Sequence, residues 1–109
     1  MPKFLLQVNF SQEAAKRLID DGGTKRAAAV QELLKQQEAR LESLYFSPQS
    51  EGPDAFAIVE VPAGGADALG TIALAARTGG ITLTARRIFT PDELDKLAAK
   101  SKGVAVPGK

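Results

Sequence analysis

Apolar and polar residues alternate in four short stretches of the chain, and a period of two residues is typical of half-buried β-strands. In the first stretch, every second residue from Phe4 to Phe10 is apolar. The pattern predicts strands at residues 4–10, 40–47, 55–61 and 81–89. In the second of them we expect Leu41 to share a side with Ser43 and Tyr45. The third is the most evenly apolar, which indicates a central strand.

Apolar residues at helical spacing occupy the segments between and after these strands. The spacing predicts helices at residues 11–20, 24–38, 66–77 and 91–100, and Gly22-Gly23 separates the first two. The last helix has the strongest local signal: Thr90 can cap it, Pro91 suits its first position and Glu93 stands three residues after the cap. These features form a capping box, so we expect the helix to begin at this point.

The predicted elements follow the order β, α, β, β, α, β, with a helix added at the end. Right-handed crossovers then place the two main helices on one face of an antiparallel sheet. We therefore expect an α+β fold, a ferredoxin-like split βαβ sandwich with a four-stranded antiparallel sheet, helices on one face and a C-terminal helix. Residues 1–100 are expected to form a single domain and residues 101–109 a flexible tail, because this tail has no apolar period. The second face of the sheet must be solvated or paired.

Composition removes several classes of function. The chain has 109 residues, 14 Lys and Arg against 13 Asp and Glu, and a formal net charge of +1. Because the basic residues are scattered, we expect neither nucleic acid nor a membrane as a partner. The absence of cysteine and histidine removes disulfides, thiolate ligands and the commonest general base, so we expect no metal and no cofactor. With no signal-like start and no apolar run of roughly 20 residues, the expected location is the cytoplasm.

Three segments give the chain a resemblance to the GYD domain family, small bacterial proteins of largely unknown function. They are residues 40–46 (RLESLYF), 52–60 (GPDAFAIVE) and 88–94 (IFTPDEL). The resemblance covers nearly all of residues 3–99. Gly52 and Asp54 match the family's Gly-Tyr-Asp signature, and Pro53 stands in place of the tyrosine.

The resemblance also implies a mode of assembly. Families similar to this one have ferredoxin-like subunits that pair sheet to sheet as dimeric α/β barrels. Some members of that wider group are cofactor-free monooxygenases, and others bind small molecules. It therefore implies a homodimer or higher homo-oligomer, whereas a shared fold constrains the activity only weakly.

The strand phase places a mixed set of side chains on the sheet face away from the helices. It comprises Gln7, Asn9, Phe56, Ile58, Glu60, Thr82, Thr84 and Arg86. Amide, hydroxyl, carboxylate, guanidinium and aromatic groups together can line a small-molecule cavity between two sheets. The alternative, which we favour, is a dimer interface in which Glu60 and Arg86 form an ion pair.

Two further residues have a functional and a structural interpretation. Asp54 can act as an acceptor or base at a pocket mouth, but an aspartate in such a loop more often binds nearby backbone N–H groups. Tyr45 can donate a hydrogen bond to a ligand, but it can equally be a strand aromatic with its hydroxyl at the surface. The candidate ligand-binding residues are Gln7, Asn9, Tyr45, Asp54, Phe56, Glu60 and Arg86, and no catalytic residue is singled out.

Two functional hypotheses follow. The leading one is a non-enzymatic, self-associating domain that can bind a small molecule at the inter-sheet face. The alternative is a cofactor-free small oxygenase whose polar cavity is formed by Gln7, Asn9, Glu60 and Arg86. The absence of histidine and cysteine favours the first hypothesis.

Overall fold

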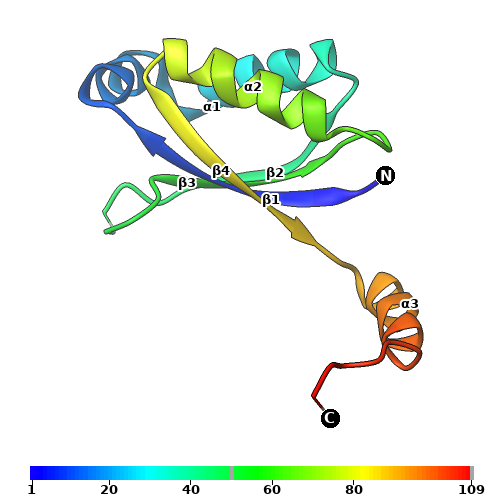
Figure 1. Cartoon of the computed structure of the whole chain (residues 1–109). Helices are drawn as coiled ribbons and strands as arrows, with labels where there is room; N and C mark the ends of the chain where they lie inside the picture. Colours follow the sequence, from blue (N-terminus) through cyan, green and yellow to red (C-terminus); the bar gives the residue numbers. More distant parts are fainter. Residues whose placement is uncertain (50, 109) are drawn as a thin grey trace.

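A computed structural model of the chain describes residues 1–49 and 51–108 (Figure 1). Within them the elements are β1 (Lys3–Phe10), α1 (Gln12–Gln36), β2 (Arg40–Phe46), β3 (Ala55–Glu60), α2 (Ala66–Thr78), β4 (Ile81–Ile88) and α3 (Pro91–Ser101). No helix of the described residues is both long enough and apolar enough to cross a membrane.

The four strands form one antiparallel sheet in the order β2-β3-β1-β4. Helices α1 and α2 lie together on one face of this sheet (Figure 1). The two β-strands at the centre, β1 and β3, are separated in sequence by α1 and β2, as the split βαβ arrangement requires. The fold prediction is confirmed: the chain has a ferredoxin-like α+β fold with a C-terminal helix.

Helix α1 contains the break that its glycines predict. Gly22 has non-helical backbone angles, φ 79° and ψ 169°, and divides α1 into two helical parts. At the start of the helix, the Ser11 hydroxyl accepts a hydrogen bond of 3.1 Å from the Ala14 N–H. The Ser11 N–H in turn donates to the Gly80 carbonyl at 2.7 Å, which joins this end of α1 to the turn between α2 and β4.

Strand β2 departs from simple alternation. Leu41 pairs with Val59, and Ser43 pairs with Ile58, the neighbour of Val59 in the antiparallel strand β3. Glu42 therefore has no partner of its own in β3 and is the extra residue of a β-bulge. A bulge of one residue shifts the alternation of side chains from there on. The prediction that Leu41 shares a side with Ser43 and Tyr45 is therefore wrong, and Leu41 packs against the core.

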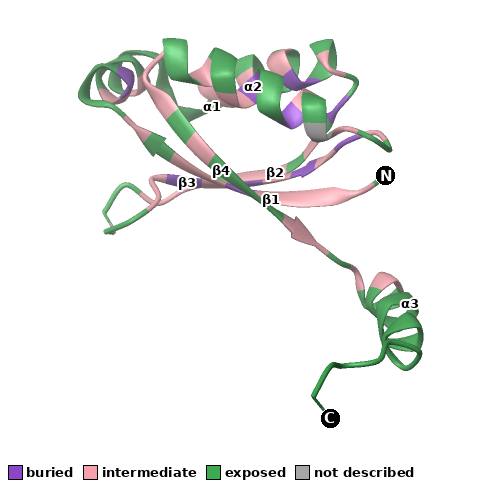
Figure 2. Cartoon of the chain, viewed as in Figure 1, coloured by how far each residue is buried: buried purple, intermediate pink, exposed green. Residues whose placement is uncertain are grey.

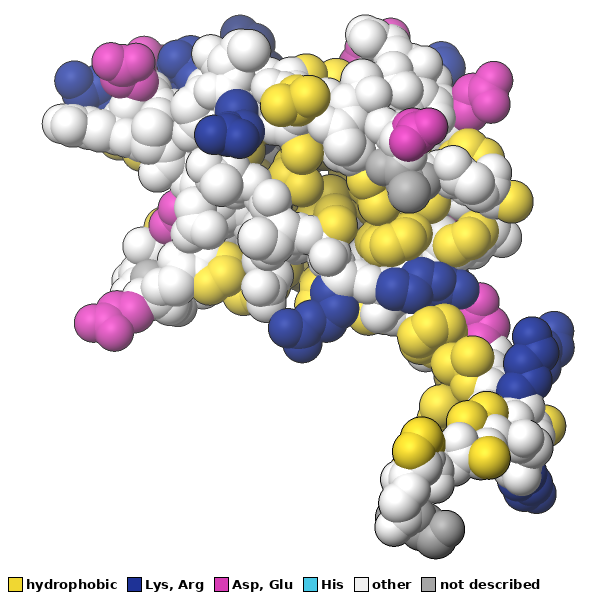
Figure 3. Space-filling model, viewed as in Figure 1, with side chains coloured by type: hydrophobic (Ala, Val, Ile, Leu, Met, Phe, Trp, Pro, Cys, Tyr) yellow, Lys and Arg dark blue, Asp and Glu magenta, His cyan; other side chains and the backbone are white. Residues whose placement is uncertain are grey.

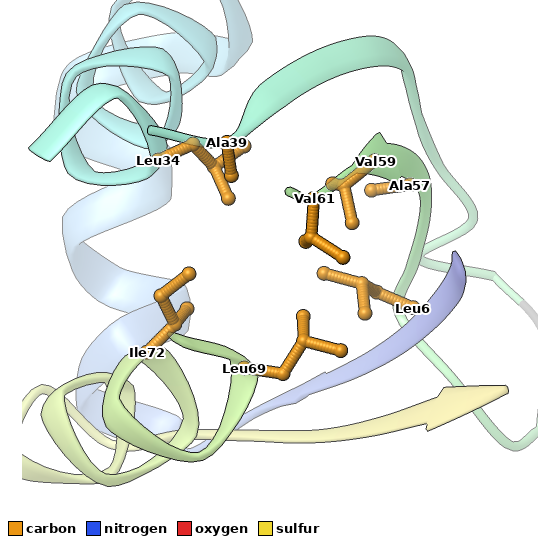
Figure 4. Close-up of a cluster of buried hydrophobic side chains, with 8 residues drawn as sticks. All are labelled: Leu6, Leu34, Ala39, Ala57, Val59, Val61, Leu69 and Ile72. Atoms are coloured by element: carbon orange, nitrogen blue, oxygen red, sulfur yellow. The ribbon is translucent and has the colours of Figure 1, made fainter. Parts of the chain in front are cut away.

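The core lies between the sheet and the two covering helices. Its fully buried side chains include Leu34 from α1 and Val59 from β3, which are 1% and 0% exposed. Figure 4 shows the cluster converging from both layers, and Figure 2 shows that burial is concentrated there. Its members are Leu6, Leu34, Ala39, Ala57, Val59, Val61, Leu69 and Ile72.

Helix α3 stands apart from this two-layer body (Figure 1). None of its residues is buried, and Figure 2 shows it almost entirely exposed. The molecule measures 56 × 31 × 23 Å, and its Cα radius of gyration is 16.6 Å. A compact chain of this length has a radius of gyration of about 13 Å, so α3 extends the molecule well beyond a compact domain.

Candidate functional site

The sheet face away from α1 and α2, here called the open face, carries a regular array of side chains. Alternation along the strands assigns to it Lys3, Leu5, Gln7 and Asn9 of β1, Arg40, Ser43 and Tyr45 of β2, Phe56, Ile58 and Glu60 of β3, and Thr82, Thr84, Arg86 and Ile88 of β4. No helix of the described residues covers this face (Figure 1).

The middle of the open face is apolar. Leu5 and Ile58 are direct partners across β1 and β3, and Phe56 follows in the next row, opposite Gln7. On the outer side Tyr45 pairs with Phe56, and its side chain is 72% exposed. Leu5, Phe56 and Ile58 are half-buried, so apolar groups gather at the centre of a face that no helix of the described residues covers.

One end of the open face is charged. The Arg40 guanidinium donates to the Glu60 carboxylate at 2.8 Å, and the Lys3 ammonium lies 3.8 Å from the same carboxylate. Lys3 also donates to Glu42 at 3.0 Å. The hydrogen bond from Arg40 lowers the pKa of Glu60 below its ordinary value, and the hydrogen bond to Glu42 raises the pKa of Lys3. The neighbouring cations thus favour the ionised form of Glu60.

Arg86 lies in a different row of the face. It is paired with Leu5, whereas Glu60 is paired with Lys3, and β1 separates the two strands. Within the described part of the chain, Glu60 binds Arg40 and no ion pair of Arg86 is formed. The ion pair between Glu60 and Arg86 that we expect at a dimer interface is thus not formed within one chain among the described residues.

Six of the seven candidate residues share the open face. They are Gln7, Asn9, Tyr45, Phe56, Glu60 and Arg86. Asp54 does not belong with them, because its carboxylate accepts a hydrogen bond of 2.8 Å from the Phe10 N–H at the end of β1. Its own N–H donates to the Val8 carbonyl at 2.8 Å, so Asp54 extends the pairing of β1 with β3. Whether any of the seven residues binds a ligand stays a prediction.

A cavity that the sequence did not predict lies on the opposite side of the sheet. This helix-side cavity has a volume of about 80 Å³. Its walls are apolar side chains from the sheet and from both helices, and Arg26 is the one charged residue among the described residues that line it. The lining residues are Leu6, Val8, Phe10, Arg26, Val30, Leu33, Leu34, Leu44, Phe46, Ala55, Ala57, Ile72, Ala76, Ile81 and Leu83.

The helix-side cavity meets a surface groove between α1 and α2. The groove, of about 230 Å³, shares Arg26, Val30, Leu33, Ala76 and Ile81 with the cavity. Figure 3 shows apolar side chains gathered in the hollow between the helix layer and the sheet. No hydrogen bond or ion pair engages the Arg26 guanidinium among the residues that the structure describes. An apolar space with a free cation at its entrance can accept an apolar molecule that has an anionic end.

Sequence reasoning missed this cavity because each of its walls looks like ordinary core. The available signal was the small size of several inward residues. Ala55, Ala57 and Ala76 occupy positions where a larger side chain would fill the space.

A third hollow lies beside the first half of α1. It has a volume of about 320 Å³ and its lining includes Phe10, Leu18, Pro48 and Asp54. Among the described residues that line this hollow, Asp54 alone has a carboxylate, and it is already bound to the Phe10 N–H. Among the described residues, no three acidic side chains gather as ligands for a metal ion.

Comparison with known proteins gives a family and no named relative. No curated protein matches the sequence. The profile of the GYD domain matches residues 4–98, which takes in all of β1 but Lys3, the other three strands, α1, α2 and most of α3. The chain belongs to the GYD domain family.

Proposed function

We propose that this protein is a self-associating domain, and that a second copy of the chain covers its open face. The observation that supports the proposal is the apolar centre formed by the half-buried Leu5, Phe56 and Ile58, beside the exposed Tyr45, on a sheet face that no helix of the described residues covers. Apolar patches that water still reaches commonly mark sites of protein association. Pairing of two sheets would remove these side chains from water.

Charge on the open face favours a second copy as the occupant. The charged end carries two carboxylates, Glu42 and Glu60, matched by the cations Lys3 and Arg40. The four charges of this end balance, and Arg86 leaves the open face with a single net positive charge, so two identical faces approach without strong repulsion. A two-fold interface uses the same patch on both subunits, and sheet-to-sheet pairing is what the family resemblance implies.

The test compares two substitutions of isoleucine by glutamate. In Ile58→Glu, a charge enters the apolar centre, and we expect the dimer dissociation constant to rise at least tenfold, on the order of the cost of burying a charge. Ile19→Glu is the matched control, because Ile19 lies on α1 and is 81% exposed. Light scattering over a series of protein concentrations measures the dimer dissociation constant of each variant. A monomeric wild-type chain at high micromolar concentration, or equal effects of the two variants, would contradict the proposal.

A second candidate function is the binding of a small apolar molecule with an anionic end. The helix-side cavity and Arg26 support it, since they combine an apolar space with a cation that has no partner among the described residues. We expect a medium-chain carboxylate such as decanoate to bind and to raise the unfolding temperature.

Substitution of the neighbouring Lys25 is the control for the role of Arg26 in decanoate binding. Arg26→Gln is expected to weaken decanoate binding about tenfold or more, as loss of a charged hydrogen-bonding partner does. Lys25→Gln removes a charge one residue away that is 74% exposed, and it should leave binding unchanged. Calorimetry on both variants decides the matter, and equal affinities would count against a role for Arg26.

The oxygenase alternative has weaker support. Its proposed residues, Gln7, Asn9, Glu60 and Arg86, line none of the three cavities described above. The alternative therefore rests on the resemblance to dimeric α/β barrel proteins. Turnover of an aromatic or quinol substrate without added cofactor would favour it over a binding role.

A further inference from the structure

Helix α3 presents an apolar stripe to water. Leu94 and Leu97 are 57% and 38% exposed, and Phe89, just before the helix, is 47% exposed. Ala98 completes the stripe at helical spacing. Figure 3 shows apolar side chains along the projecting part of the molecule. The helix has 11 residues, and isolated helices shorter than about 12–15 residues are marginal in water. Helix α3 therefore needs a surface on which to pack.

Arg87 directs α3 away from its own chain. Its guanidinium donates to the Glu93 carboxylate at 3.0 Å and to the Lys3 carbonyl at 3.2 Å. It also lies over the Phe89 ring, 4.4 Å from the centroid, and over the Phe4 ring at 5.9 Å. These contacts join the first turn of α3 to β1 and β4 and fix the direction in which the helix leaves the sheet.

The direction of α3 matches the position expected for a second subunit. Figure 1 shows α1 and α2 on one side of the sheet and α3 beyond the other side, toward which the open face looks. A molecule seated on the open face would thus lie beside α3. One partner can cover both the apolar centre of the sheet and the apolar stripe of the helix.

Charge on α3 argues against a membrane as the partner. Its polar positions mix Asp92 and Asp95 with Lys96 and Lys100. Helices that lie on anionic membranes carry an excess of lysine and arginine on the polar face. Because Glu93 adds to Asp92 and Asp95, the acidic residues of α3 outnumber its two lysines, and the helix lacks that excess.

We propose that the apolar stripe of α3 packs on a second copy of the chain, the copy that sits on the open face. In a two-fold dimer the contact is reciprocal, so each subunit is held by the α3 helix of the other. This inference rests on the proposed self-association and adds a second contact surface to it. The stripe consists of Phe89, Leu94, Leu97 and Ala98.

Paired serine substitutions on opposite sides of α3 test the inference. Leu94→Ser with Leu97→Ser removes the stripe, and we expect the dimer dissociation constant to rise at least tenfold, as expected when two buried leucine side chains are lost. Lys96→Ser with Ala99→Ser is the control on the opposite side of the helix, and it should leave the constant within about twofold of the wild type, as surface substitutions usually do. Circular dichroism checks that the body of each variant remains folded. Equal dissociation constants for the two variants would overturn the inference.

Cross-linking identifies the molecule that α3 touches. A photoreactive phenylalanine analogue replaces Leu97, and chains labelled with ¹⁴N and ¹⁵N are mixed before irradiation. We expect cross-linked peptides of mixed isotope, because the contact joins two chains. Cross-links of a single isotope only would show that α3 folds onto its own chain and would overturn the inference. Binding of wild-type protein to phosphatidylglycerol vesicles that is lost in Leu94→Ser with Leu97→Ser would overturn it too.

The same measurements separate this inference from the proposed function. If Ile58→Glu dissociates the dimer and the α3 variant does not, self-association through the open face stands and the role of α3 fails. If the wild-type chain is monomeric and yields no mixed-isotope cross-links, both fail. Dissociation by both variants, with mixed-isotope cross-links, supports both.

Discussion

Glu93 combines two roles at the start of α3. Its carboxylate accepts a hydrogen bond of 2.9 Å from the Thr90 N–H and another of 3.0 Å from Arg87. The first bond completes the capping box, and the second ties the helix to the sheet. The residue therefore sets both the beginning of α3 and its direction. The sequence predicted the first role, because a capping box is local, but not the second, because Arg87 reaches Glu93 only once β4 is in place.

Acid should weaken this junction. The backbone hydrogen bond from Thr90 and the bond from Arg87 lower the pKa of Glu93 from 4.5 to about 2. A lowered pKa in the folded chain means that the stabilisation is complete above the unfolded value and is lost as the pH falls from about 4.5 toward 2. We expect NMR shifts of residues 92–98 to lose helical character over this range. Glu93→Gln should show less helix at neutral pH and should lack this transition; an unchanged profile in that variant would contradict the assignment to Glu93.

Substitution of Thr90 tests whether α3 packs against the two-layer body of its own chain. The Thr90 hydroxyl accepts a bond of 3.2 Å from the Glu93 N–H, and losing such a cap costs about 1 kcal/mol. Because no residue of α3 is buried, we expect Thr90→Ala to speed amide exchange in α3 about fivefold in the monomer, since local opening governs exchange there. The urea midpoint of the body should not change. A lower midpoint in the monomer would show that α3 packs on its own chain.

At the level of elements, periodicity predicted most of the fold because each strand and helix of the body buries one side. The alternating segment forms strand β1, and the segment with helical spacing forms helix α2, as predicted. Strand β2 shows where such reasoning fails. The bulge at Glu42 depends on pairing with β3, and nothing in the residues of β2 alone marks the extra position.

The core of the body should dominate its stability. Leu34 is 1% exposed and joins α1 to the sheet, so Leu34→Ala should lower the free energy of unfolding by about 2–5 kcal/mol. Leu74→Ala is a matched control on α2, where the side chain is 67% exposed, and it should cost less than about 0.5 kcal/mol. Urea denaturation measures both. Similar losses for the two variants would mean that Leu74 is covered in solution, for instance by another copy.

On the scale of the whole molecule, the sequence predicted two surfaces that need a partner, but it did not predict how the elements that carry them are arranged in space. The pattern gave α3 an apolar face and left one side of the sheet uncovered, and both features are present in the structure. It did not place α3 apart from the body, because an amphipathic pattern states that a face is apolar and not what covers it. The helix-side cavity could not be predicted from the sequence either, since its volume depends on how α1 and α2 pack over the alanines of β3.

Glu60 offers a measurement that distinguishes a bare open face from a covered one. The Glu60 side chain is 12% exposed, but that of its partner Arg40 is 71% exposed, and the water that reaches Arg40 weakens the pair. When a second copy covers the face, water is excluded and the same pair interacts more strongly. We therefore expect the coupling between Glu60→Gln and Arg40→Met, obtained from a double-mutant cycle, to be small at concentrations where the chain is monomeric and clearly larger in the dimer.

The same cycle with Arg86→Met in place of Arg40→Met shows whether the two copies bring Glu60 and Arg86 together. Within one chain Arg86 is paired with Leu5 and lies in a different row from Glu60, so the monomer should show no coupling between them. Coupling that appears only in the dimer would mean that Arg86 of one copy reaches Glu60 of the other. Denaturation of each variant at the two concentrations supplies both cycles. If neither coupling depends on protein concentration, no second copy covers the open face, because its arrival would have changed the surroundings of Glu60.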